Sequence, residues 1–242
     1  MFTIQAWGKT DIGSVRKENQ DNILLDDNLN LYIVADGMGG YKGGALASQI
    51  ATEKLSSFLN ENSSSFEESN IARYFNQAYS QANSSIYSTA QKKEGFKGMG
   101  TTMVSCLVFD NTFYIANVGD SRTYLFRDNL LWQVTKDHSL AEENLNIGQP
   151  IKNINANIIT RSVGYSPDVK VDIIERPIQE GDCLLLCSDG LNKMISDSEL
   201  EELLQKRNSK TIAKDLIKLS NDRRSIDNVS VLWIEVKANK KK

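Results

Sequence analysis

LYIVADG, residues 31–37, is an apolar run of strand type that ends on an aspartate followed by a glycine. Two more apolar runs end on an aspartate, FYIANVGD (residues 113–120) and LLLCSD (residues 184–189), and the second of these also continues into a glycine, Gly190. A strand that ends buried normally turns on Gly, Asn or Ser. Aspartates at three such ends therefore require a physical explanation.

Four aspartates are candidates for one shared site. Three close the apolar runs above, and the fourth comes just before the last run, VSVLWIEV; they are Asp36, Asp120, Asp189 and Asp227. If the last strand runs antiparallel to the others, all four carboxylates reach the same edge. They would repel one another unless a cation held them, and hard divalent ions prefer oxygen ligands. The pattern predicts a Mg²⁺ or Mn²⁺ site, and a single histidine, His138, argues against a His-rich zinc site.

Composition narrows the class of protein. The chain has 242 residues and a net charge of −3, which gives no electrostatic case for nucleic acid. No apolar run is long enough for membrane insertion, and the start MFTIQAWGKTD lacks the features of a signal peptide, so a cytoplasmic location is expected. The three cysteines lie in apolar runs and are expected to be buried thiols.

Periodicity predicts a mixed α+β protein. Strands are expected at 2–8, 101–110, 112–118, 121–128, 130–135, 158–164, 171–178, 183–190 and 229–236, and a hairpin at 22–36 with its turn at Asp26 to Asn30. Helices are expected at 45–61, 67–93, 197–207 and 211–224. The four strands between 101 and 135 are expected to form an antiparallel meander. Residues 137–157 lack periodicity and predict an irregular excursion.

Strands in the middle, with helix pairs after the first and last strand blocks, fit four layers: helix, sheet, sheet and helix. Nothing in the pattern suggests a second domain or a linker. We therefore expect a single domain over residues 1–242, an α-β-β-α sandwich of two mostly antiparallel sheets.

The motifs together resemble the metal-dependent serine/threonine protein phosphatases of type 2C, specifically their bacterial branch. The matching segments occur in the family's order along nearly the whole chain: Arg16-x-x-Asn19-Gln20-Asp21, VADGMGG (34–40), GTT (100–102), NVGDSRTY (117–124), TKDHS (135–139), ITRSVG (159–164), LLLCSDGL (184–191) and Asp227-Asn228-Val229-Ser230.

The resemblance implies roles for individual residues. Asp36 would bridge two Mn²⁺ or Mg²⁺ ions, with Asp189 and Asp227 on the first ion and the backbone carbonyl of Gly37 on the second. Asp21 would act through coordinated water, and Arg16 would bind the substrate phosphate. Asp120, with Asp189, would hold a third and weaker metal ion described for bacterial members.

The implied reaction is hydrolysis of phosphoserine and phosphothreonine by direct attack of a metal-bridged hydroxide on phosphorus. The implied partners are phosphorylated proteins and a cognate eukaryotic-type Ser/Thr kinase, and the implied state is a monomer. The 137–157 excursion corresponds to a short flap beside the active site, where specificity often resides.

Two positions depart from the family pattern. Family members carry a histidine either directly after the Asp-Gly pair or after the double glycine, and this chain has Met38 and Tyr41 there. A protein general acid is therefore not evident at either position, which leaves metal-held water as the proton donor. His138, in the TKDHS loop, is expected to orient that loop.

Three alternatives compete with this interpretation. A dinucleotide-binding loop at Gly37–Gly43 is disfavoured because a second helix, not a parallel strand, follows the first. A non-catalytic phosphoprotein-binding module is disfavoured because the aspartates and Arg16 are all present. A small-molecule phosphohydrolase on the same fold stays open.

Overall fold

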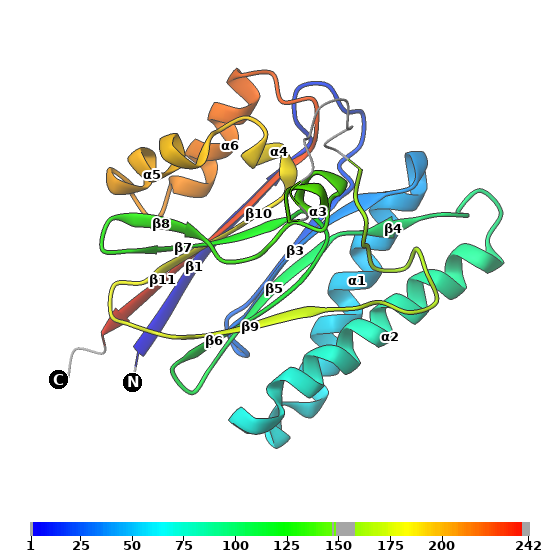
Figure 1. The fold of residues 1–242 in the computed structure, drawn as a ribbon, viewed down its shortest axis with the longest axis horizontal. Coiled ribbons are helices and arrows are strands. Elements are labelled where there is room, and N and C mark those ends of the chain that lie inside the picture. The colour runs from blue at the N-terminus through cyan, green and yellow to red at the C-terminus, as the bar shows by residue number, and fades with distance from the viewer. Residues whose placement is uncertain (1, 147, 149–157, 239–242) are drawn as a thin grey trace.

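Two antiparallel sheets form the middle of the molecule (Figure 1). The computed structural model describes residues 2–146, 148 and 158–238. The first sheet has the order β1-β11-β10-β7-β8 and consists of β1 (Phe2–Asp11), β11 (Val229–Ala238), β10 (Cys183–Cys187), β7 (Arg122–Arg127) and β8 (Leu130–Gln133). The second has the order β2-β3-β5-β6-β9 and consists of β2 (Asp21–Asp26), β3 (Leu31–Met38), β5 (Met103–Phe109), β6 (Thr112–Val118) and β9 (Asp172–Pro177), with the short β4 (Gly100–Thr101) paired to β3.

Helices cover the outer face of each sheet (Figure 1). The second sheet packs against α1 (Gly40–Asn62) and α2 (Ile71–Lys92), which are joined by two short 3₁₀ turns. The first sheet packs against α4 (Asp189–Asn192), α5 (Asp197–Gln205) and α6 (Ile212–Asp222). The remaining helix, α3 (Leu140–Asn146), follows β8. The expected α-β-β-α sandwich is confirmed.

Three hydrophobic clusters fill the spaces between the four layers. One lies between the α1–α2 pair and its sheet, one between the sheets, and one between the first sheet and α4–α6. The inner face of α2 is buried, at Ile71, Phe75, Ala78, Ala82 and Ile86. The three cysteines are buried free thiols, as expected. No described helix has the length and apolar character needed to cross a membrane.

Two tight hairpins have the turn chemistry that their sequences predict. Asp110-Asn111 joins β5 to β6, and Asp128-Asn129 joins β7 to β8. All four residues have positive φ, between 44° and 61°. Asp and Asn tolerate this left-handed conformation, which matches the twist of paired strands in a two-residue hairpin.

The expected meander is wrong at one connection. β6 pairs with β5 and β9, whereas β7 pairs with β8 and β10, so the chain crosses from one sheet to the other at Gly119–Ser121. Alternating hydrophobicity is the same in either sheet, and therefore cannot reveal the crossing. This crossing is what places Asp120 between the two sheets.

Three further expectations need correction. Residues 158–164 form only isolated bridges, at Ile159 and Val163, in place of a strand. The 137–157 excursion contains the helix α3, while its residues 147 and 149–157 lie outside the described part of the chain. Helix α1 begins at Gly40 rather than at Ala45, because the glycine-rich turn itself forms the first helical turn after Gly39.

The glycine in each Asp-Gly pair is required by close packing of backbone. A Cβ on Gly37 would lie 2.0 Å from the carbonyl oxygen of Gly44, at the start of α1. A Cβ on Gly190 would lie 2.0 Å from the carbonyl oxygen of Asn228, next to β11. Each aspartate is thus followed by a residue that lets two backbones approach.

We expect Gly190→Ala to destabilise the protein by about 1–3 kcal/mol, because the new methyl group must displace backbone rather than a flexible side chain. Chemical denaturation measures this free energy of unfolding. Gly43→Ala is the matched control, since its Cβ would meet Met99 at 3.0 Å and little else. Equal stability of the two variants would contradict the packing argument.

Candidate metal centre

Asp21 and Asp36 face each other across the β2–β3 ladder, where they are register partners. Asp36 lies two residues before the end of β3, and not at its tip. Its backbone N–H donates to Thr102 Oγ1 at 3.2 Å, and its carbonyl accepts from the Thr102 N–H at 2.8 Å. The GTT segment therefore fixes the backbone that carries Asp36.

Asp21 joins the two sheets through hydroxyl groups. Its Oδ2 atom lies 2.8 Å from Ser188 Oγ and 2.7 Å from Ser230 Oγ. Ser188 follows β10 and Ser230 lies in β11, so both belong to the opposite sheet. The Oγ atom of Ser188 also accepts from the Ser230 N–H at 2.9 Å. One carboxylate oxygen of Asp21 is thus hydrogen-bonded to the opposite sheet.

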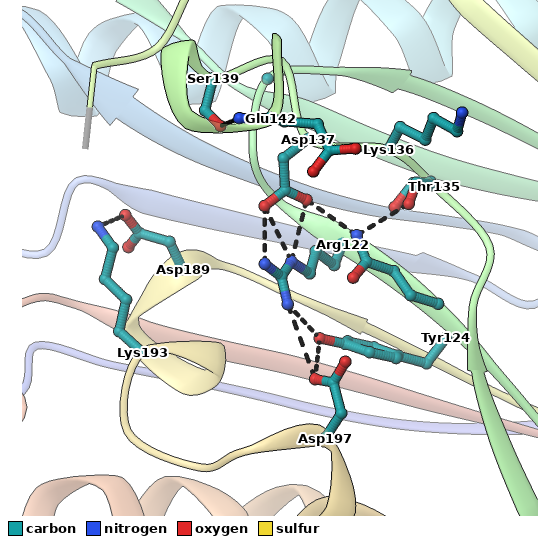
Figure 2. Close-up of polar contacts among 12 residues, drawn as sticks. Arg122, Tyr124, Thr135, Lys136, Asp137, Ser139, Glu142, Asp189, Lys193 and Asp197 are labelled. Carbon is teal, nitrogen blue, oxygen red and sulfur yellow. Dashed lines mark hydrogen bonds and ion pairs between the residues drawn. The ribbon is translucent and has the colours of Figure 1, made fainter. Parts of the chain in front are cut away.

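Asp189 and Asp120 approach this pair from two different connections. Asp189 is the first residue of α4, which begins directly after β10. Asp120 lies in the crossing between β6 and β7. Both are buried, with 7% and 6% of their surface exposed. Asp189 Oδ2 forms an ion pair with the ammonium group of Lys193, one helical turn further on (Figure 2).

Asp227 lies just before β11 and forms an ion pair with Arg16, whose Nη2 atom is 2.7 Å from Asp227 Oδ2. The loop that carries Arg16 is held by Asn228. Its side chain accepts from the Gln20 N–H at 2.9 Å and donates to the carbonyls of Ile12 and Glu18 at 2.8 and 3.0 Å. The side chain of Arg16 stays about half exposed, at 48%.

Burial and mutual repulsion raise the pKa values of these carboxyls. Burial raises the pKa of Asp21 to about 7, even though the Ser230 and Ser188 hydroxyls lower it. Burial, followed by repulsion from Asp21 and Asp189, holds the pKa of Asp36 well above its usual range. Burial and the charge of Asp189 raise the pKa of Asp120 to about 7. Full ionisation of these carboxyls is therefore unfavourable unless a positive charge is added to the cluster.

The donor set suits hard divalent cations. Oδ1 atoms of Asp21, Asp120 and Asp189 are buried and have no hydrogen-bond partner among the described residues. Buried oxygens normally have partners, and a bound ion explains such exceptions. No three His, Cys, Asp or Glu side chains in the described part of the chain converge closely enough to hold an ion. Two of the carboxylates, Asp189 and Asp227, face Lys193 and Arg16 instead.

A cleft of about 1120 Å³ opens at this end of the sandwich. The predicted site residues on its wall are Arg16, Asp36, Gly37, Asp189 and Asp227. Asp21 and Asp120 do not line the cleft and lie behind this wall. Met38 lines the cleft, and the side chain of Tyr41 is not among those described.

His138 holds the crossing that carries Asp120. Its Nδ1 atom accepts from the Gly119 N–H at 2.9 Å, and its own backbone N–H donates to the Gly119 carbonyl at 2.9 Å. Burial lowers the pKa of His138, which favours the neutral ring that this contact requires. The ring is 6% exposed and lies outside the cleft wall, in agreement with the expected role in orienting the loop.

Figure 2 shows a polar network beside this loop. Arg122 Nη2 lies 2.8 Å from Asp137 Oδ2, and Arg122 Nη1 donates to the Tyr124 hydroxyl at 2.8 Å. The Tyr124 hydroxyl donates in turn to Asp197 Oδ1 at 2.9 Å. The network links the TKDHS loop to the first turn of α5, whose N-cap is Ser196.

Residues 14–224 match the family model described as Protein phosphatase 2C. The chain belongs to this family. The serine/threonine phosphatase stp of Listeria monocytogenes is 36% identical over 236 residues, with 94% of each chain covered. The phosphatase PstP/Ppp of Mycobacterium tuberculosis has a TM-score of 0.89 at 29% identity, with 98% of this chain and 100% of that chain covered. A catalytic domain of PstP in complex with two manganese ions has a TM-score of 0.88 at 30% identity, with the same coverage.

The function is that of a serine/threonine phosphatase of the 2C type, as expected from the motifs. The nucleotide-binding alternative is wrong, because β3 and α1 lead into α2 within an antiparallel architecture.

Sequence reasoning missed the polar support of the phosphatase site. Ser188, Ser230 and Asn228 lie next to predicted ligands, within the motifs CSDG and DNVS, and hold Asp21 and the Arg16 loop. The motifs indicate that these residues lie near the site. A serine next to an aspartate can form many local hydrogen bonds, so the sequence alone does not show that its partner is Asp21. It also missed Lys193, because a lysine one helical turn after an aspartate is common on solvated helix faces.

The raised pKa of Asp21 predicts how stability depends on pH when chelator removes metal. Below its ordinary value of 3.8 the carboxyl is protonated in the folded and unfolded chains alike. As pH rises toward about 7 the unfolded chain loses this proton first, so the free energy of unfolding falls. In EDTA we expect the calorimetric Tm to fall between about pH 4 and about pH 7, and to fall less in Asp21→Asn.

Asp26→Asn, at the other end of β2, is the control and should reproduce the wild-type fall. An equal fall of Tm with pH in the wild type and in Asp21→Asn would show that the raised pKa of Asp21 does not cause the loss of stability.

Proposed function

We propose that this phosphatase hydrolyses phosphoserine and phosphothreonine in proteins with two divalent ions, Mn²⁺ or Mg²⁺, bound at the base of the cleft. The observation that carries the proposal is the set of buried, unpartnered carboxylate oxygens behind and along the cleft wall. The Mn²⁺-bound PstP domain supports the choice and number of ions. Asp36, Asp189, Asp227 and the Gly37 carbonyl would hold the ions.

Bound there, divalent ions lower the pKa of water and polarise a phosphoryl oxygen. The residues of the chain provide the rest. Arg16, half exposed on the cleft wall, would bind the phosphate with its guanidinium fork. Asp21, held by Ser188 and Ser230, would keep one oxygen directed at the centre. A cysteinyl-phosphate intermediate is not expected, because the three cysteines are buried and burial raises the pKa values of their thiols.

A protein substrate fits the rim of the cleft better than a small metabolite. Three apolar side chains on the rim are mostly exposed: Val15 at 60%, Tyr165 at 62% and Ile226 at 65%. Val15 and Ile226 lie on the Arg16 side, and Tyr165 belongs to the segment after ITRSVG. Exposed apolar groups around an anion site suit residues that flank a phosphorylated side chain.

Several finer expectations stay predictions. They are a single domain over residues 1–242 with a flap near 137–157, a cytoplasmic monomer, and a cognate eukaryotic-type Ser/Thr kinase that makes the substrates. The resemblance also predicts a third, weaker ion at Asp120, but the positive charge of Lys193 beside Asp189 argues against that ion.

The proposed centre predicts loss of activity when a bridging or terminal carboxylate is replaced. Asp36→Asn and Asp189→Asn should each lower kcat/KM for phosphopeptides by more than about a hundredfold, since even residues behind metal ligands cost 10–100-fold. EDTA should abolish wild-type activity, and added Mn²⁺ should restore it. Phosphate release from phosphoserine and phosphothreonine peptides measures both. Full activity of Asp36→Asn would remove this residue from the centre.

Loss of the Arg16 side chain is predicted to weaken phosphate binding more than metal binding. Arg16→Ala should raise KM for a phosphopeptide and the inhibition constant for inorganic phosphate by about tenfold, the cost of one charge-assisted contact. The Mn²⁺ affinity, measured by calorimetric titration, should change far less. Lys17→Ala removes the same charge one residue away and serves as control. An unchanged response to phosphate in Arg16→Ala would rule out the role.

A further inference from the structure

Lys193 brings a cation of the chain itself into the acidic centre. It follows the last residue of α4, and its backbone N–H donates to the Asp189 carbonyl at 3.0 Å. This turn directs its side chain back along α4, where the ammonium group pairs with Asp189 Oδ2 (Figure 2). The side chain is 34% exposed and lines the cleft.

The ammonium group acts on more than one carboxylate. Burial lowers the pKa of Lys193, but the charges of Asp189, Asp120 and Asp227 outweigh it and raise that pKa. After burial, the charge of Asp189 is the next cause that raises the pKa of Asp120. Each of them has a buried Oδ1 atom without a hydrogen-bond partner among the described residues. Lys193 therefore lies where positive charge relieves the repulsion between these two aspartates.

The two oxygens of Asp189 have different surroundings. Oδ2 is taken by Lys193, whereas Oδ1 is buried and unpartnered. One oxygen can thus serve the two-ion centre while the other remains with the lysine. A tethered ammonium group needs no recruitment from solution, and it would repel a divalent ion approaching the same pair of carboxylates.

We propose that Lys193 is a resident cation that neutralises Asp189 and Asp120 in place of a third metal ion, so that this phosphatase binds two ions and no more. The inference rests on the proposed two-ion centre. It assigns Asp120 to the lysine rather than to a metal of its own. It also makes Lys193 a positioning residue that holds Asp189 through Oδ2.

The test counts bound Mn²⁺ per chain by equilibrium dialysis with elemental analysis, using the full chain. We expect two ions in the wild type and in Lys193→Arg, which keeps the positive charge. In Lys193→Met, which keeps the length of the side chain but not the charge, we expect one additional and weaker site. Adding Asp120→Asn to Lys193→Met should remove that site again.

Lys218→Met is the matched control. Lys218 also pairs with an aspartate four residues away, Asp222 at 2.9 Å, but on the exposed face of α6. Its stoichiometry should equal that of the wild type. Circular dichroism checks folding of each variant, and Lys193→Gln provides a second neutral side chain if Lys193→Met does not fold.

The other outcomes separate the possible failures. A wild type that binds no Mn²⁺ overturns the two-ion centre and this inference with it. Two ions in both the wild type and the neutral variants overturn the inference alone, as do three ions in the wild type. A neutral variant that keeps two ions but shows a raised KM for phosphopeptide would identify Lys193 as a phosphate ligand instead.

Discussion

The contact between Asp21 and two serines of the opposite sheet fixes the acidic end of the sandwich. Asp21 lies in β2, opposite Asp36, while Ser188 and Ser230 belong to the strand ends that carry Asp189 and Asp227. A buried carboxylate is costly without partners, so these hydroxyls both satisfy one oxygen and set the distance between the sheets. Two further contacts hold neighbouring parts of the site: Asn228 accepts from the Gln20 N–H, and Thr102 accepts from the Asp36 N–H.

The sequence was sufficient to predict the layers of the fold. Alternating and helical periodicities placed most elements, and hairpin turns such as Asp110-Asn111 appear where the chemistry of Asp and Asn predicts them. Asp189, after β10, and Asp227, before β11, lie at the same end of the first sheet because the two strands are antiparallel, as expected from the sequence. The roles of these residues came from the family resemblance, since a lone aspartate at a turn is usually a cap.

Other features depend on contacts between residues that are distant in sequence. The crossing between β6 and β7 is invisible to periodicity, because inward-facing positions alternate identically in either sheet. The pairing of Arg16 with Asp227 joins residues at opposite ends of the chain, and no local pattern encodes it. Helix α3 and the bridges at Ile159 and Val163 are short, and short elements take their shape from their neighbours rather than from propensity.

The tether from Asn228 to the loop of Arg16 has a consequence for biosynthesis. The proposed phosphate-binding arginine is translated long before Asn228, the residue that holds its loop. β1, likewise, finds its partner only when β11 has been made. A nascent or truncated chain therefore lacks both an ordered arginine and Asp227, however well its first helices pack. The loop of Arg16 can therefore take its final position only after Asn228 and β11 have been made.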